Sequence, residues 1–325
     1  MKAIRKITFW GFVLSMCSCN PAGTMEERHV DVAKQVSFTL IPMECEDAQS
    51  RISMDASANY SWEKNDIVGI FPTKGGQVDF SIPEEQAGKP TIKFDGGGWS
   101  LKSGQFYYAY APFNFYNRNK QSIPFSYLGQ EQDGSVEDRR KHLSNYLFFA
   151  SIPTKKEDEA LTLQFGHVGA VLNVSLTLPV ATTYASMTIF TTNGAKVLPV
   201  KKEFNLETTL INNTNVSIDE TVTEYSDRLT LNLKNVTTLE PNEVVDLCMA
   251  FPSFSAEGVY LGVVVYDVFG FKYSANLLRV DNGTHAEAKF SKNRYQRRKA
   301  SPVLNENFNF GVSNWGTGSN TQGDV

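Results

Sequence analysis

Short apolar stretches that alternate with polar residues recur along nearly the whole chain, and tight-turn sequences separate them. Gln35 to Pro42 and Ala170 to Leu178 are rich in β-branched and aromatic residues, as strands with one buried face require. The same character marks the ranges 66–71, 105–111, 229–236 and 259–268. Residues that tolerate positive φ angles lie at 74–76, 95–98, 193–194, 212–213 and 281–283. Helical periodicity is scarce, and its best example is 135–145. The pattern predicts an all-β chain built of antiparallel sandwiches.

The first twenty residues have the layout of a bacterial export signal. Three basic residues precede an apolar run at 7–16, and the lipobox-like Cys17-Ser18-Cys19-Asn20 follows. The run is about ten residues, too short to cross a bilayer core that needs roughly twenty. We therefore expect residues 1–19 to be a cleaved signal peptide and Cys19 to be the lipidated residue, because the small Ser18 precedes it. An ordinary secretory signal that contains cysteines is the alternative.

The net charge and the cysteine content of the chain limit the classes of function that it can have. The formal net charge of −4 gives no basic field for a phosphate backbone, so we expect no nucleic acid as a partner. After the signal only Cys45 and Cys248 remain, and two cysteines do not make a disulfide framework. We expect two buried thiols in preference to one bridge, and the sequence leaves their pairing open.

The length predicts two domains, at roughly 100 to 200 residues per domain. After a linker at 20–34, we place an N-terminal β-sandwich at 35–157 and a C-terminal β-sandwich at 158–300. The boundary depends on the polar run 154–159, for which a charged hairpin loop inside one domain is an equal alternative. The basic run 294–299 is interpreted as a solvated strand end. Residues 301–325, rich in Asn, Gly, Ser and Thr, are predicted to be a flexible polar tail, and the sequence does not tell whether the chain ends naturally at Val325.

Catalytic and metal-binding patterns are not evident in the sequence. The four histidines are scattered outside metal-ligand spacings, so we expect no metal and no cofactor. His167 lies beside apolar strand positions, and a hydrogen-bonded structural role is the favoured interpretation. Aromatic residues concentrate at 106–116, where Tyr108 and Tyr116 could stack on a glycan. Core packing of these rings is the alternative, because half of a strand's side chains point inward.

Two segments carry a family resemblance. The first is Tyr60 to Phe71 (YSWEKNDIVGIF), with FYYAYAPF at 106–113 after it, and the second is Phe165-Gly166-His167 with the strand that follows. In these segments the chain resembles the fimbrillin family, lipoprotein subunits of the type V pili of Gram-negative anaerobes. Members typically show a tryptophan, an acidic residue, a Gly-Asp before a strand ending in Phe, and later Tyr-Ala-Tyr-x-Pro. Here Asn65 replaces the usual glycine. The resemblance runs from the lipobox to about Lys299.

The resemblance implies two tandem transthyretin-like β-sandwich domains and assembly into pili by exchange of a strand between subunits. In that scheme a protease removes the first strand, and an extended segment of a neighbour fills the groove. The first strand here is 35–42, and Arg51 follows the polar loop after it. We hypothesise processing after Arg51, since a cut after Arg28 would leave the strand in place. A loop arginine with no such role is the alternative.

The expected function is a structural subunit or adhesin of a surface pilus, and not an enzyme. Expected partners are other pilus subunits, the outer membrane through the lipid anchor, and host or bacterial surface ligands. The expected location is the outer membrane and, after processing, the fimbrium. The sequence leaves open a stalk, anchor or tip role and the ligand of an adhesin. A monomeric surface lipoprotein that binds glycans is the main alternative, and a glycoside hydrolase is third, because paired carboxylates meet only in space.

Overall fold

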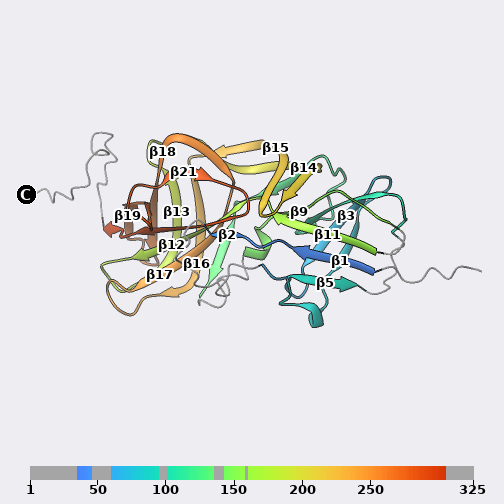
Figure 1. The fold of residues 1–325 in the computed structure, drawn as a ribbon. Helices are drawn as coiled ribbons and strands as arrows, with labels where there is room; N and C mark the ends of the chain where they lie inside the picture. The colour runs from blue at the N-terminus through green and yellow to red at the C-terminus, as the bar shows by residue number, and fades with distance from the viewer. Residues whose placement is uncertain (1–34, 46–59, 95–100, 135–142, 158–159, 305–325) are drawn as a thin grey trace, which may run out of the picture. The chain divides into compact units, whose positions relative to one another are not determined.

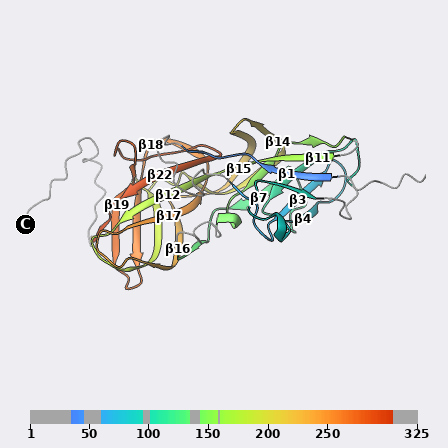
Figure 2. The ribbon, with the colours of Figure 1, turned by 60° about the horizontal axis from the view of Figure 1, so that its bottom comes forward.

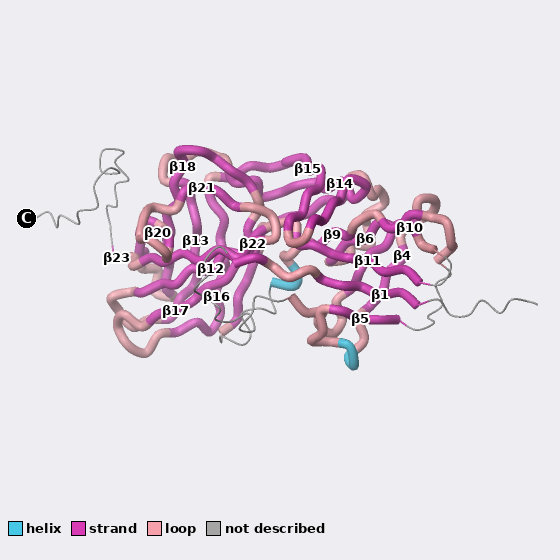
Figure 3. The backbone as a smooth tube through the Cα atoms, viewed as in Figure 1, coloured by secondary structure: helices cyan, strands magenta, loops and turns pink. Residues whose placement is uncertain are grey.

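Almost every secondary-structure element in the described part of the chain is a β-strand. The computed structural model describes residues 35–45, 60–94, 101–134, 143–157 and 160–304 (Figure 1). Two single-turn 3₁₀ helices, η1 (Glu84–Gln86) and η3 (Leu143–Asn145), interrupt the strands (Figure 3). Of the helix expected at 135–145, residues 135–142 lie outside the described ranges. The prediction of an all-β sandwich class is confirmed.

The first sheet holds the amino-terminal strand between two others. Its order is β4 (Val78–Ser81), β3 (Ile67–Pro72), β6 (Phe106–Ala111), β9 (Phe149–Ser151), β11 (Ala160–His167), β1 (Gln35–Leu40) and β5 (Thr91–Phe94), and β10 (Thr154–Lys155) pairs with β6. β1 runs parallel to β11 and antiparallel to β5, and the three lie side by side in Figure 1. Because side chains alternate along β1, its even-numbered residues are buried, as the sequence pattern predicts.

A three-stranded sheet packs on one face of this first sheet. It consists of β15 (Asn215–Ser226), β14 (Leu198–Asn212) and β7 (Ile123–Ser126). Phe71 and Phe148 on the first sheet's side share one hydrophobic cluster with Ile123, Phe204 and Val216 of the smaller sheet. The rings of Phe148 and Phe204 stack with their centroids 4.5 Å apart. The two sheets packed face to face form a sandwich, and this packing positions the loop after β6.

Two further sheets share a second apolar layer. One has the order β17 (Val244–Phe251), β12 (Ala170–Thr177), β22 (Arg294–Ala300) and β2 (Glu44–Cys45), with β20 (Leu278–Arg279) on β22. The other runs β23 (Val303–Leu304), β19 (Lys272–Asn276), β18 (Phe254–Asp267), β13 (Thr183–Thr191), β16 (Arg228–Thr237) and β8 (Gln130–Asp133), with β21 (Glu287–Phe290) on β18. Figure 2 shows β12 between β17 and β22. Val171 and Val174 of β12 belong to the same hydrophobic cluster as Met187, Leu231 and Val263 of the second sheet.

Strands from the two predicted halves of the chain share sheets. β11, just after residue 157, pairs with β1, whereas β7 and β8, before it, pair with β14 and β16. The segment from β1 to β2 contributes one strand to the first sheet and one to the sheet of β22. Two tandem domains divided between 157 and 158 therefore stay a prediction. Strands from before and after this point pair within the same sheets.

The sheet register places the two cysteine backbones far apart. Cys45 lies opposite Tyr295 on β22, and Cys248 lies opposite Asn173 on β12, so three inter-strand spacings, about 14 Å, separate their strands. A disulfide needs Cα atoms within roughly 7 Å. The two cysteines are therefore not bonded to each other. Cys248 is buried, and its Sγ lies 3.3 Å from Asn173 Oδ1.

The interpretation of 294–299 as a solvated strand end was wrong. These residues form most of β22, an interior strand of its sheet, and Arg298 is only 3% exposed. Burial is tolerated because the Arg298 guanidinium donates to the Arg297 carbonyl and to Gln296 Oε1, each at 2.8 Å. A buried cation is retained where hydrogen bonds compensate its lost hydration. No single-sequence pattern separates such an arginine from a solvated one.

Candidate functional site

The first candidate site is the slot that β1 occupies. The Phe38 side chain is fully buried at the centre of an aromatic cluster. Its ring centroid lies 5.2 Å from Phe94 on β5, 5.7 Å from Phe165 on β11 and 5.7 Å from Phe80. Trp62 closes the cluster at 6.1 Å. Edge-to-face and tilted contacts of this kind add to the free energy of burial. The slot therefore selects an extended strand with large apolar side chains at alternate positions.

Polar contacts hold the other end of the same segment. Glu44 on β2 forms an ion pair with Arg294 and accepts a hydrogen bond from the Thr214 hydroxyl. The Asn293 amide donates to the Pro42 carbonyl at 3.0 Å and to the Thr214 carbonyl at 2.9 Å. The segment is thus anchored by apolar burial at β1 and by charge and hydrogen bonds at β2.

A buried hydrogen-bonded chain lies between these two anchors. Tyr60 Oη lies 2.9 Å from Met43 Sδ and 2.9 Å from His167 Nδ1. Because the hydroxyl has one hydrogen, it donates to Met43 when the His167 Nδ1–H donates to it. Burial lowers the pKa of His167 to about 3, so the imidazole is neutral at physiological pH. His167 is buried and hydrogen-bonded, as the sequence leads us to expect.

The predicted site residues fall in different places. Cys19 and Arg51 lie outside the described residues, and so does the turn at 95–98. Tyr108 on β6 is half-buried, and the Lys120 ammonium lies 5.2 Å above its ring. Tyr116, in the loop after β6, is 84% exposed. Of the two named stacking aromatics, only Tyr116 is well exposed, and the exposed Phe115 lies beside it, within the aromatic range 106–116 expected from the sequence.

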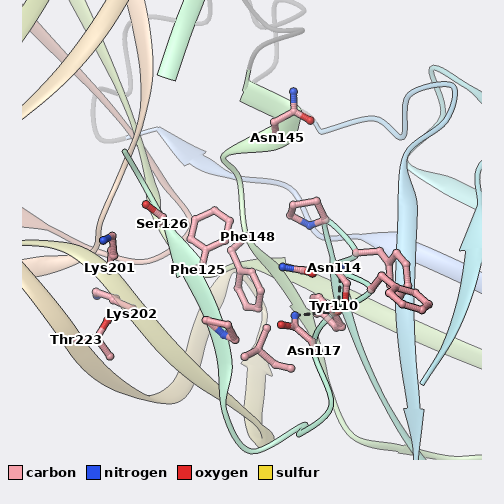
Figure 4. Close-up of a pocket in the computed structure, with 15 residues that line it drawn as sticks. Tyr110, Asn114, Asn117, Phe125, Ser126, Asn145, Phe148, Lys201, Lys202 and Thr223 are labelled. Carbon is pink, nitrogen blue, oxygen red and sulfur yellow. Dashed lines mark hydrogen bonds between the residues drawn. The ribbon is translucent and has the colours of Figure 1, made fainter. Parts of the chain in front are cut away.

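The second candidate site is a pocket of about 650 Å³ between the loop after β6 and the sheet of β7, β14 and β15. Figure 4 shows Lys201, Lys202 and Thr223 on one side and Tyr110, Asn114 and Asn117 on the other. Phe125 and Phe148 lie between the two sides. Its volume lies within the range of ligand pockets, roughly 300 to 1,000 Å³. The signal that could have found it is the Asn- and aromatic-rich sequence PFNFYNRN directly after β6.

Tyr110 fixes the loop that forms one wall of the pocket. Its hydroxyl accepts hydrogen bonds from the Asn114 backbone N–H at 3.1 Å and from the Asn117 amide at 3.0 Å. It donates to Gln77 Oε1 at 3.0 Å. The Tyr110 ring fits because β3 has a glycine beside it: a Cβ atom on Gly69 would lie 2.6 Å from Tyr110 Cε1. The loop is therefore held by a buried side chain from the sheet below.

The two lysines at the pocket are paired with carboxylates. Lys201 Nζ lies 2.6 Å from Glu224, on the neighbouring strand. The buried Lys202 Nζ lies 2.7 Å from Glu220 and donates to the Ser253 carbonyl at 2.7 Å. Burial lowers the pKa of Lys202, and Glu220 opposes that shift. Each lining lysine thus has a carboxylate partner, and Glu220 also pairs with Lys292 at 3.2 Å. Among the described residues, no group of three or more His, Cys, Asp or Glu side chains could hold a metal ion. None of the helices in this part of the chain could span a membrane.

Solved structures from Bacteroides resemble this chain. A candidate cell adhesion protein from Bacteroides ovatus matches with a TM-score of 0.50 and 9% identity, over 84% of this chain and 95% of that one. Another from Bacteroides fragilis gives a TM-score of 0.47 at 9% identity, over 84% and 95%. A fimbrial protein from Bacteroides ovatus gives 0.35 at 11% identity, over 84% of this chain and 50% of that one. No protein-family model and no curated protein sequence matches the chain. The first of these structures shows that this chain shares its fold, as the resemblance to fimbrillins implies.

Proposed function

We propose that this protein is a fimbrillin-like surface subunit or adhesin that assembles by exchange of its first strand. The observation that carries the proposal is the placement of β1. It is a short strand between β11 and β5, and its buried Phe38, Val36 and Leu40 fill an apolar slot. An extended peptide from a neighbour could occupy the same slot through main-chain hydrogen bonds and alternate side chains. The role is structural, and no catalytic residue takes part.

Processing after Arg51 would remove β1 and β2 together, because both precede that residue. Loss of β1 exposes Ile92 and Phe94 of β5 and Leu163 and Phe165 of β11, which are the register partners of the buried residues of β1. An open apolar groove of this kind is costly in water, so a neighbour's strand is favoured to fill it. We propose Arg51 as the processing site on this ground.

The proposed location is the cell surface, with Cys19 as the lipid-anchored residue before processing and the fimbrium as the destination after it. The proposed partners are other pilus subunits, the outer membrane through the lipid, and surface ligands on host or bacterial cells. The shared fold with a candidate cell adhesion protein supports a surface role. Two tandem sandwich domains remain part of this proposal.

Amino-terminal sequencing of protein extracted from surface fibres tests the processing step. The proposal predicts a mature chain that begins at Ile52. A chain that begins at Cys19, or between Cys19 and Gln35, would keep β1 in place and would contradict strand exchange by this chain.

Glycan binding is a second candidate function, and the exposed loop after β6 favours it. Phe115 is 63% exposed and Tyr116 is 84% exposed, and their rings meet edge to face at 5.9 Å. Contiguous exposed apolar surface is a feature of interaction sites. A tip adhesin would combine this function with the first.

A further inference from the structure

We propose that the pocket between the loop after β6 and the sheet of β7, β14 and β15 binds a neutral oligosaccharide, with Phe115 as its stacking ring. This inference rests on the adhesive part of the proposed function, and strand exchange is independent of it. The site differs from the predicted pair Tyr108 and Tyr116, because the pocket is lined by Phe115 and by neither of those residues.

The pocket combines apolar rings with uncharged polar groups. Phe113 and Phe125 are half-buried and line it, and Phe115 stands exposed in the lining. Exposed amides come from Asn114 and from Asn145 of η3. Sugars present one face of weakly positive C–H groups and an edge of hydroxyls. The C–H face suits the negative face of an aromatic ring, and the hydroxyls suit amides that both donate and accept.

Neither lysine that lines the pocket is free to bind an acidic ligand. The two lysines are already paired, Lys201 with Glu224 at 2.6 Å and Lys202 with Glu220 at 2.7 Å. An acidic ligand would have to compete with these carboxylates for the ammonium groups and would meet their negative charge. Arg118 lies outside the lining, and its guanidinium covers one face of the Phe115 ring at 4.8 Å from the centroid.

The loop is already fixed in one conformation. The Gln77 amide donates to the carbonyls of Asn114 at 3.0 Å, Phe115 at 3.4 Å and Asn117 at 2.8 Å. Asn114 Oδ1 in turn accepts the Tyr116 N–H at 2.9 Å. A preformed loop loses little conformational entropy when a ligand binds. These bonds hold the Phe115 ring out of the core. In a mobile loop, the ring could fold back into the core.

Calorimetric titration of the full chain tests this site. The probes are neutral hexasaccharides of glucose, galactose, mannose and N-acetylglucosamine, with hexagalacturonate as the acidic comparison. We expect at least one neutral probe to bind, and Phe115→Ala to weaken that binding by about tenfold, since an aromatic contact worth about 1.4 kcal/mol gives that factor. Phe115→Trp should retain binding.

The matched control is Phe269→Ala, which removes another exposed ring (77%, against 63% for Phe115) from the turn between β18 and β19. This variant should bind like the original chain. Absence of binding to every neutral probe, stronger binding of hexagalacturonate, or equal losses in the two alanine variants would each overturn the proposal. Thermal unfolding of both variants checks that the fold is kept. Loss of surface polymers in Phe115→Ala is not expected, so failure of this site is distinguishable from failure of strand exchange.

Discussion

The Phe38 ring on β1 meets the Phe165 ring on β11 nearly edge to face, with centroids 5.7 Å apart and planes at 75°. Phe38 lies opposite Leu163 in a parallel pair, so the Phe165 ring reaches it diagonally across the strands. Parallel pairing between segments 125 positions apart in the chain ties the amino-terminal strand to the body of the fold, and this contact is the core of the proposed exchange site.

Replacement of Phe38 by alanine should destabilise the chain strongly. The fully buried ring leaves a cavity among four aromatic neighbours, and such substitutions cost about 3 to 5 kcal/mol. Denaturant unfolding measures the loss. Ser37→Ala, on the opposite face of β1, is the control and should change the free energy of unfolding by less than about 1 kcal/mol. Similar small losses in both variants would show that β1 is not packed as described.

Gly69→Ala should disturb the wall of the pocket. The added Cβ would lie 2.6 Å from the Tyr110 ring, so the ring must shift, at a cost of about 1 to 3 kcal/mol. The matched control is Gly76→Ala in the β3–β4 turn, where a Cβ atom meets nothing within 4 Å. We expect a lower unfolding midpoint for the first variant alone. An unchanged midpoint for Gly69→Ala would contradict the close contact between β3 and Tyr110.

The Glu44–Arg294 ion pair should show measurable coupling. Both side chains are about one-third exposed, so a double-mutant cycle with Glu44→Gln and Arg294→Gln is expected to give about 0.5 to 1 kcal/mol, reduced by salt. The Lys64–Glu84 pair, at 53% and 75% exposure, is the control and should couple less. A coupling energy of zero between Glu44 and Arg294 would show that this ion pair does not anchor β2.

The stability of the chain should fall in mild acid because of His167. Its pKa is about 3 in the folded chain against an ordinary 6.5, so between these values only the unfolded chain binds this proton. The free energy of unfolding therefore decreases as pH falls below 6.5, by at most about 1.4 kcal/mol per pH unit. Asp66 opposes this, because burial raises its pKa to about 6 and the folded chain then binds the extra proton.

Comparison with His167→Gln isolates the histidine, since Asp66 is present in both chains. Unfolding at pH 7 and at pH 5 should show the original chain losing stability relative to the variant as pH falls. A constant difference between the two chains would show that His167 does not stay neutral in the fold.

Much of the strand pattern could be predicted from sequence. The ranges expected at 35–42, 66–71, 105–111 and 170–178 match β1, β3, β6 and β12 to within a few residues, because alternation of side chains reports a buried face directly. The turns at 74–76 and 212–213 join paired strands, as their glycines and asparagines indicate. These strands and turns could be predicted because turn and strand preferences depend on only a few neighbouring residues.

The pairing of distant strands could not be predicted. No periodicity tells that β1 pairs with β11, that β8 pairs with β16, or that Arg298 lies inside a sheet. The pocket was missed for the same reason, because Asn114 and Phe115 line the same pocket as Lys201 only through the packing of two sheets. Sequence reasoning named Tyr116 from aromatic content but could not tell which neighbouring ring the loop would present.

The most direct test of strand exchange compares surface polymers of the original chain with those of Arg51→Ala, with Arg28→Ala as the matched control. Outer-membrane extracts are run unheated and boiled and probed with antibody to residues after Gly169. We expect a high-mass ladder that collapses on boiling in the original chain and in Arg28→Ala, and a single band near monomer size in Arg51→Ala. The same ladder in all three chains, or a monomer band in all three, would contradict exchange triggered at Arg51.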